Sequence, residues 1–272
     1  MLFQKSVHAI IPFALVTLSS LQCLPQTYAS NLRQDSTRIL ESTEQEQPGD
    51  EFDFYVLSMS YQPEFCYQNK HKNFPGCENP RDFWRQSLTL HGLWPEDDDG
   101  SWPSNCSTEQ FDPKTVEDLG PDRFAQLWPN VKASEEEHSD AHYGFWKHEW
   151  EKHGTCTGLT QDEYFDTALK HFFPTPPFVH DNYGLEVSKV DLLNEYRGDV
   201  DGYLGNVVLV CSGGKYLSEV RICVAKYKDG TGAQRIRCTA QVEKKANCPK
   251  KIMIPKFYID EDREAEVDLK IE

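Results

Sequence analysis

Residues Phe145–Cys156 read FWKHEWEKHGTC, a stretch that combines large aromatic residues with ionisable ones. Each residue of an α-helix turns by about 100°, so side chains four positions apart lie on the same side. Four ionisable side chains then fall within an arc of about 140°: His148, Glu149, Lys152 and His153. Glycine commonly follows the last turn of a helix, so Gly154 marks its expected end. We therefore expect a helix over residues 143–153 that presents these groups to one cavity.

Two other interpretations of this stretch differ in their chemistry. Zinc proteases carry the helix signature HExxH, whose histidines lie four residues apart and are separated by about 40°. His148 and His153 lie five residues apart, and Lys152 would place a positive charge beside the metal. A solvated helix face with paired charges is the second alternative. The combination favours a catalytic cluster, and we expect neither a metal nor another cofactor.

A second stretch, Leu88–Pro95, reads LTLHGLWP and places His91 in a short apolar run. A single histidine in such a run is more often structural, but here Gly92 and the indoles of Trp94 and Trp102 follow. Aromatic rings offer stacking surfaces to the bases of single-stranded RNA. Two histidines can supply the base and the acid of phosphoryl transfer, and a lysine can stabilise the charge that develops. These residues together can supply the groups needed to cleave RNA through attack by a 2′-hydroxyl group.

The composition is that of an acidic globular protein. The 272 residues suffice for one large domain, and a hydrophobic fraction of 38% suits a real core. Proteins that bind nucleic acid tightly are usually basic, so the formal net charge of −16 disfavours a binding module. An enzyme that releases its product needs only a local positive pocket, and an acidic surface suits an acidic compartment.

The N-terminus has the features of a secretory signal peptide. Residues 10–21 form an apolar segment too short to span a membrane, and residues 27–29 provide a small-residue cleavage site. The alternative is a membrane anchor or a buried helix. We expect the protein to be secreted or delivered to a vacuolar or lysosomal lumen, with no membrane attachment after cleavage. The expected parts are a signal peptide over 1–29, a flexible extension over 30–51, one domain over 52–258 and an acidic tail over 259–272.

Eight cysteines remain after Cys23 leaves with the signal peptide. An even number in a secreted chain implies up to four disulfides, but the spacing of the cysteines alone does not select a pairing. Asn105-Cys106-Ser107 matches the sequon for N-glycosylation, which makes Asn105 the candidate site.

Helices are interleaved with strands early in the chain, and strands dominate late. Helices are expected over 113–128 with a break at Gly120-Pro121, over 161–173 after a capping box of Thr160 and Glu163, and over 189–196. Strands are expected over 54–61, 207–210, 216–227 and 233–239, whereas 66–106 reads mostly as loops around the apolar run 88–93. The fold class is therefore α+β: an antiparallel β-sheet core flanked by several helices, in a single disulfide-stapled domain.

Both stretches resemble the active-site signatures of the ribonuclease T2 family of secreted acid ribonucleases. The matching strings are HGLWP at His91–Pro95 and FWKHEWEKHGTC at Phe145–Cys156, and the resemblance covers roughly residues 52–255. It implies cleavage of single-stranded RNA, not of DNA, by a monomer without metal. The products would be 2′,3′-cyclic phosphate ends and then 3′-phosphate ends.

The resemblance also implies a role for each matched residue. His153 would be the general base that takes the 2′-hydroxyl proton, and His91 would be the general acid at the leaving 5′-oxygen. His148 would bind the phosphate. Glu149 and Lys152 would polarise the phosphate and stabilise the pentacovalent transition state.

Base-binding residues and disulfides follow from the same resemblance. The first base would contact Trp94, Glu96 and Trp102, and the second base would contact Pro129, Asn130 and Phe145. Glu96 stands where fungal members often carry aspartate, and Trp102 where a tyrosine is common, so base preference stays open. The implied disulfides are Cys66–Cys77, Cys106–Cys156, Cys211–Cys248 and Cys223–Cys238.

Two alternatives in function remain open at this stage. A member of the family that has lost catalysis would act in RNA binding or signalling, but it should then lack His91 or His153, and both are present. A secreted protease or glycosidase would need a carboxylate pair that cannot be identified. Because one histidine must be protonated and the other neutral, we expect a bell-shaped rate profile with an acidic optimum. The remaining histidines are expected at the surface: His71, His138, His142, His171 and His180.

Overall fold

The computed structural model describes residues 52–133, 140–196 and 207–259. The chain consists of two units, Met1–Gln45 and Glu46–Glu272, and every described residue belongs to the second. The expected signal peptide, the extension over 30–51 and the tail from residue 260 onward lie outside the described residues. Ile259 packs against the buried cluster of Trp84 and Phe257.

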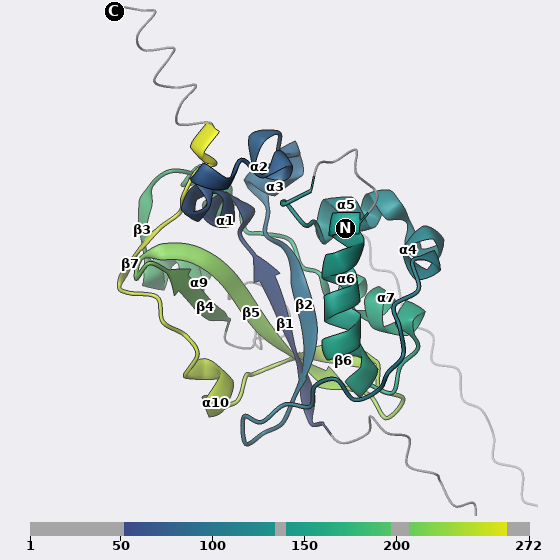
Figure 1. The fold of residues 1–272 in the computed structure, drawn as a ribbon. Coiled ribbons are helices and arrows are strands. Elements are labelled where there is room, and N and C mark those ends of the chain that lie inside the picture. The colour runs from purple at the N-terminus through teal and green to yellow at the C-terminus, as the bar shows by residue number, and fades with distance from the viewer. Residues whose placement is uncertain (1–51, 134–139, 197–206, 260–272) are drawn as a thin grey trace, which may run out of the picture. The chain divides into compact units, whose positions relative to one another are not determined.

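The described residues form a mixed β-sheet whose longest strand, β5, lies at its centre (Figure 1). The strands are β1 (Phe54–Ser60), β2 (Thr89–Glu96), β3 (Glu186–Ser188), β4 (Val208–Ser212), β5 (Tyr216–Lys226), β6 (Gly232–Ile236) and β7 (Lys251–Met253). Their order is β2-β1-β5-β7-β3, and β4 and β6 also pair with β5. The pairing is antiparallel, as expected, except at one place where β7 runs parallel to β5. The chain reaches β7 through β6 and a helix, and such a crossover returns it in the direction of β5.

The side chains of β1 point alternately to the two faces of the sheet. Leu57 and Met59 enter the main hydrophobic core beneath the helices. Val56 belongs to a smaller cluster on the other face, which Ser58 shares by alternation. The register of β1 with its two neighbours then places five residues on that second face: Gly92, Trp94, Glu96, Glu219 and Arg221.

A β-bulge interrupts the pairing of β1 with β2 at His91. Ser58 pairs with Gly92 and the next residue, Met59, pairs with Leu90, which leaves His91 without a partner in the register. An extra residue of this kind changes the direction in which its side chain points. Leu90 is fully buried, whereas the His91 side chain is 33% exposed. The bulge therefore turns His91 out of the core.

Helices cover the sheet and largely follow the sequence signals. The break between α4 and α5 falls at Gly120-Pro121 as predicted, and α7 begins with the predicted capping box of Thr160 and Glu163. Helix α9 begins after Ser188, although the Ser188 side chain makes no capping hydrogen bond. The helices are α1 (Gln62–Gln68), α2 (Pro75–Glu78), α3 (Asp82–Gln86), α4 (Lys114–Leu119), α5 (Pro121–Leu127), α6 (Asp140–Lys152), α7 (Gln161–His171), α8 (Pro177–Asp181), α9 (Lys189–Glu195) and α10 (Ala240–Glu243).

Two expectations about local structure are wrong. The segment 66–106, expected to be mostly loops, contains the end of α1 as well as α2 and α3. These helices are short, and α2 begins with Pro75 at its first position, where the missing N–H costs nothing. His142, expected at the surface, is only 2% exposed. It stacks on Trp146 and accepts a hydrogen bond from the backbone of Asn130, so it belongs to the core.

The described residues form four disulfides with the pairing implied by the resemblance: Cys66–Cys77, Cys106–Cys156, Cys211–Cys248 and Cys223–Cys238. The last of these joins β5 to the segment after β6, so it ties the central strand to the edge of the sheet. Among the described residues, no helix is long and apolar enough to cross a membrane.

Candidate active site

Helix α6 presents ionisable groups on one side because its tryptophans occupy the other. Trp146 and Trp150 are 3% and 1% exposed and lie in the main core. The Trp146 indole donates a hydrogen bond of 2.9 Å to the Trp128 carbonyl, which fixes the rotation of the helix. The helix runs beside β2 (Figure 1). Consequently its other side meets the strand that carries the bulged His91.

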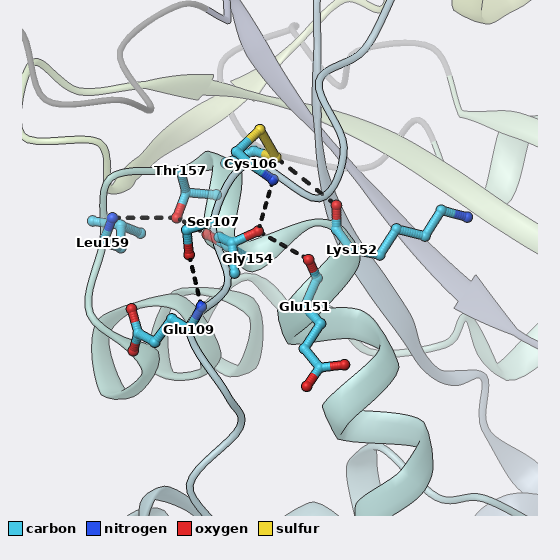
Figure 2. The surroundings of a disulfide bond; sticks show 10 residues. Cys106, Ser107, Glu109, Glu151, Lys152, Gly154, Thr157 and Leu159 are labelled. Atoms are coloured by element: carbon cyan, nitrogen blue, oxygen red, sulfur yellow. Dashed lines mark hydrogen bonds between the residues drawn. A yellow bond between two sulfur atoms is a disulfide. The ribbon is translucent and has the colours of Figure 1, made fainter.

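The C-terminal end of α6 is fixed by the Cys106–Cys156 disulfide and its surroundings (Figure 2). The last carbonyls of a helix lack partners within it. Here the Lys152 carbonyl accepts a hydrogen bond from the backbone N–H of Asn105 at 2.9 Å. The Glu151 carbonyl accepts a hydrogen bond from the Thr155 hydroxyl at 2.9 Å. The same hydroxyl accepts a hydrogen bond from the backbone N–H of Cys106 at 3.2 Å. The loop that follows β2 thereby holds the helix end that carries the ionisable residues.

Gly92 allows α6 and β2 to approach each other closely. A Cβ atom at this position would lie 2.1 Å from Glu149 Oε2 and 2.2 Å from Trp94 Nε1. In the space that glycine leaves, the Trp94 indole donates a hydrogen bond of 2.9 Å to Glu149 Oε2. Glu149 is only 1% exposed, so this bond satisfies a buried carboxylate. The glycine of the HGLWP string is therefore required by packing.

Strand β5 contributes two charged residues that sequence analysis missed. Glu219 Oε1 lies 2.8 Å from His91 Nδ1. Arg221 donates to Glu219 Oε2 from Nε at 2.9 Å and from Nη2 at 2.6 Å, and its guanidinium lies 5.2 Å from the centre of the Trp94 ring. A signal was present, because two charged residues at alternate positions of an apolar strand share one face. The sequence predicts the strand over 216–227, but neither signature string links the charged face of this strand to the site.

Lys245, which follows α10, is a third residue that the sequence did not reveal. It donates a hydrogen bond of 2.5 Å to Glu96 Oε1, and its ammonium group lies 5.1 Å from the centre of the Trp102 ring. Glu96 is 4% exposed, so its carboxylate is buried and paired. Trp102, by contrast, is 55% exposed. No local motif links residue 245 to residues 96 and 102, since only the fold brings them together.

Two cavities meet at His91 and His148, which line both. The Trp94 cavity has a volume of about 300 Å³ and is also lined by Trp94, Glu96, Trp102, Glu149, Lys152 and His153. The Phe145 cavity has a volume of about 470 Å³ and is also lined by Pro129, Asn130 and Phe145. Every catalytic or base-binding residue expected from the sequence therefore lies on one of two adjoining cavities.

The two histidines from the end of α6 lie where their protonated forms are disfavoured. Burial, followed by the charges of Lys152, His148 and His91, lowers the pKa of His153 to about 3. Burial and then the charge of Lys152 also lower the pKa of His148. Nδ1 of His153 is buried and has no hydrogen-bond partner among the described residues. His153 is therefore neutral in mildly acidic solution and can accept a proton.

His91 lies in the opposite environment. Burial lowers its pKa, but the hydrogen bond with Glu219 and the charges of Glu149 and Glu219 outweigh burial, so the pKa of His91 is raised. Burial raises the pKa of Glu219, yet His91 and Arg221 outweigh it and bring this pKa down to about 2. Burial raises the pKa of Glu149 to about 6. A proton donor and a proton acceptor thus lie in one cavity, and such separated pKa values are typical of acid–base catalysis.

Comparison with known proteins identifies the fold and its family. The model of the Ribonuclease T2 family matches residues 52–238. Ribonuclease DdI of Dictyostelium discoideum is 33% identical over 209 residues, which cover 71% of this chain and 81% of that protein. The chain belongs to the ribonuclease T2 family. Ribonuclease 1 of Arabidopsis thaliana is 37% identical over 123 residues, which cover 44% of this chain and 50% of that protein.

Solved T2 ribonucleases share the architecture. A crystal structure of a mutant of RNase MC1 in complex with 5′-UMP matches with a TM-score of 0.57 and 26% identity, and covers 75% of this chain and 98% of that chain. RNase MC1 comes from the seeds of bitter gourd. The α+β fold expected from the sequence is confirmed, and the protein is a T2-type endoribonuclease.

Proposed function

We propose that this T2 ribonuclease cleaves single-stranded RNA through attack of a 2′-hydroxyl on the adjacent phosphate, with 2′,3′-cyclic phosphate ends hydrolysed later to 3′-phosphate ends. The observation that supports this reaction most directly is the opposed environments of His91 and His153. A neutral histidine beside a protonated one supplies the base and the acid that the transfer needs. DNA lacks the 2′-hydroxyl, so it cannot react in this way.

Each ionisable residue then has a role. His153 takes the proton of the 2′-hydroxyl, and His91 gives a proton to the leaving 5′-oxygen. His148 borders both cavities and binds the phosphate between them. Lys152 stabilises the pentacovalent transition state, in which negative charge grows on the phosphoryl oxygens. Glu149 does so in its protonated form, below its pKa of about 6, by donating a hydrogen bond.

The positions of the two histidines assign a polarity to the RNA strand. His153 lines the Trp94 cavity alone, so the nucleoside whose 2′-hydroxyl attacks lies there, with its base beside Trp94 and Trp102. The leaving nucleoside then occupies the Phe145 cavity beyond His91. Lys152, Arg221 and Lys245 line the first cavity together with Glu96 and Glu149, so the lining carries an excess of positive groups that attracts RNA in an acidic protein. A complex of an RNase MC1 mutant with 5′-UMP supports binding of nucleotides in this fold.

The same residues give the expected dependence on pH. The base must be neutral, so activity rises as the pH increases through the pKa of His153, about 3. The acid must be protonated, so activity falls as the pH passes the pKa of His91, which lies above the ordinary value of 6.5. The optimum lies between these limits, in acidic solution.

The protein is further proposed to act as a secreted or vacuolar monomer. Four disulfides persist best in an oxidising compartment, and the N-terminal sequence has the features of a signal peptide. Asn105 lies on an exposed loop, where a glycan can be attached. Expression with the native N-terminus, followed by mass spectrometry of the medium, would test secretion. Mass spectrometry of residues 100–110 would test whether Asn105 carries a glycan.

A digest tests the proposed reaction. Oxidised protein is incubated with single-stranded RNA at pH 5 in EDTA, beside a DNA of the same sequence, and the product ends are analysed. We expect cleavage of RNA alone, with 2′,3′-cyclic phosphate ends. If correctly folded protein binds the RNA without cutting it, the non-catalytic alternative replaces this proposal.

A further inference from the structure

We propose that Glu219 is the positioning residue of the general acid: its carboxylate holds the His91 imidazolium through Nδ1 and leaves Nε2 free for the 5′-oxygen. This role deepens the function proposed above and rests on it. Neither signature string contains Glu219, which lies 128 positions from His91 in the sequence. The central strand β5 supplies this residue to the site.

The two oxygens of the Glu219 carboxylate bind different partners. Oε2 accepts hydrogen bonds from Ser58 Oγ at 3.1 Å and from both Nε and Nη2 of Arg221. Oε1 remains for His91 Nδ1 at 2.8 Å. Glu219 is 13% exposed, so these charge-assisted bonds are little screened by water. Ser58 and Arg221 face each other across β1 and β5, so the sheet itself fixes the orientation of the carboxylate.

His91 is fixed from the opposite side. Its carbonyl accepts a hydrogen bond of 2.8 Å from the Trp128 indole, which holds the backbone of the bulge. Its ring lies 5.1 Å from the Trp94 ring and 5.9 Å from the Phe145 ring, centre to centre. The imidazole therefore lies between the two cavities with one nitrogen committed to Glu219.

The proton balance follows from these contacts. An ionised carboxylate accepts hydrogen bonds only, so Nδ1 of His91 carries a proton and the second proton of the imidazolium lies on Nε2. When the bond between phosphorus and the 5′-oxygen breaks, its electron pair stays on the oxygen, and the Nε2 proton moves to that oxygen. His91 is then neutral and still donates from Nδ1 to Glu219, which stays ionised.

Glu219 is also the carboxylate that keeps its charge while the enzyme works. Two carboxylates face His91, but Glu149 has a pKa of about 6 and becomes protonated in acid. Glu219 has a pKa of about 2 and remains an anion throughout the expected range. The charged and titratable groups around His91 come from β5 and from the end of α6: Glu219, Arg221, His148, Glu149 and His153.

The test exploits a substrate that needs no acid. A dinucleoside phosphate releases a poor leaving group, the 5′-alkoxide, whereas a nucleoside 3′-(4-nitrophenyl phosphate) releases 4-nitrophenolate unaided. For Glu219→Gln we expect kcat/KM to fall about 10²- to 10³-fold on the dinucleoside phosphate and by less than about threefold on the aryl ester. The alkaline limb of the rate profile should move to lower pH while the acidic limb stays in place. Glu117→Gln removes an equal charge from an exposed position of α4 and serves as the control.

Three outcomes would overturn the role of Glu219. An equal loss on both substrates would indicate a structural defect, and an unmoved alkaline limb would show that Glu219 does not act on His91. An additional loss on combining Glu219→Gln with His91→Ala would show that the two residues act independently. NMR titration measures the pKa of His91 in the wild type and in Glu219→Gln, and so reports on the pairing of His91 with Glu219 without requiring turnover of a substrate. A lower His91 pKa in the variant is expected even if neither substrate is cleaved, in which case only the proposed function fails.

Discussion

His91 and His153 have the same imidazole side chain but lie in contrasting surroundings. His91 lies in a strand bulge with Nδ1 bonded to Glu219. His153 directly follows helix α6, next to Lys152, and its Nδ1 has no partner within the part of the chain that the structure describes. The pKa of His91 is raised and that of His153 is lowered to about 3. The carboxylate beside His91, and burial together with the ammonium group of Lys152 at His153, thus give the two histidines opposite protonation states.

The position of His153 at the end of a helix would by itself suggest a raised pKa. The C-terminal end of a helix usually favours a positive charge, because its last carbonyls are unpaired. At the end of α6 the carbonyls of Glu151 and Lys152 already accept hydrogen bonds, which weakens that attraction. Burial and the charge of Lys152 then decide the protonation state. The difference between the regions therefore comes from partners supplied by the fold.

The largest effect is expected from removing the proposed general base. His153→Ala should lower kcat/KM by up to about 10⁴-fold on both the dinucleoside phosphate and the aryl ester, since both reactions begin with the 2′-hydroxyl. His91→Ala should be severe only on the dinucleoside phosphate. Steady-state kinetics of the two variants on the two substrates would check this. Equal behaviour of the two variants would remove the distinction between the histidines.

Removing the ammonium group beside His153 should have the next largest effect. Lys152→Met should lower kcat about 10²- to 10³-fold, because the variant loses the cation proposed to stabilise the transition state. The charge of Lys152 lowers the pKa of His153, so the acidic limb of the rate profile should move to higher pH in the variant. Lys147→Met, on an exposed position of the same helix, is the matched control and should leave the profile unchanged.

A smaller effect is expected at Gly92, where strand β2, which carries His91, approaches helix α6. In Gly92→Ala the new methyl group would meet the Glu149 carboxylate and the Trp94 indole, which must move apart. We expect a loss of about 1–3 kcal/mol in stability and of about 10- to 100-fold in kcat/KM. Thermal unfolding and kinetics measure the two effects. Gly144→Ala on α6 has nothing within 4 Å of the new methyl group and should be neutral or stabilising.

The smallest effect concerns the exposed wall of the Trp94 cavity. Trp102→Ala should raise KM for RNA about fivefold, the lower end of the range for loss of one stacking surface, because the ring is 55% exposed. The rate with saturating RNA should change little. Tyr227→Ala removes a ring of similar exposure outside both cavities and should leave KM unaltered. Equal KM values for both variants would remove Trp102 from the binding surface.

The sequence predicted what is encoded locally. The alignment of four ionisable residues on α6 follows from helical geometry, and the capping box at Thr160 follows from adjacent residue types. The break at Gly120-Pro121 has the same local origin. Such features depend on neighbours a few residues away, so a single sequence contains enough to place them.

The parts that sequence analysis missed depend on residues far apart in the chain. The bulge at His91 requires the register of β1 against β2, and the pairing of Lys245 with Glu96 spans 149 positions. His142 was expected at the surface. It stacks on Trp146 one helical turn away, but its burial depends on the packing of this side of α6 against the core and on the hydrogen bond from the backbone of Asn130. Tertiary packing decides these cases, and local pattern carries no information about it.

Titration of the histidine rings by NMR tests the central claim most directly. Spectra of protein labelled with ¹⁵N at histidine, recorded from pH 3 to pH 9 and assigned with His91→Ala and His153→Ala, report protonation at each ring nitrogen. We predict that His91 titrates above 6.5 with Nδ1 protonated throughout, and that His153 stays neutral down to about pH 3. If His153 titrates above His91, the assignment of acid and base is contradicted.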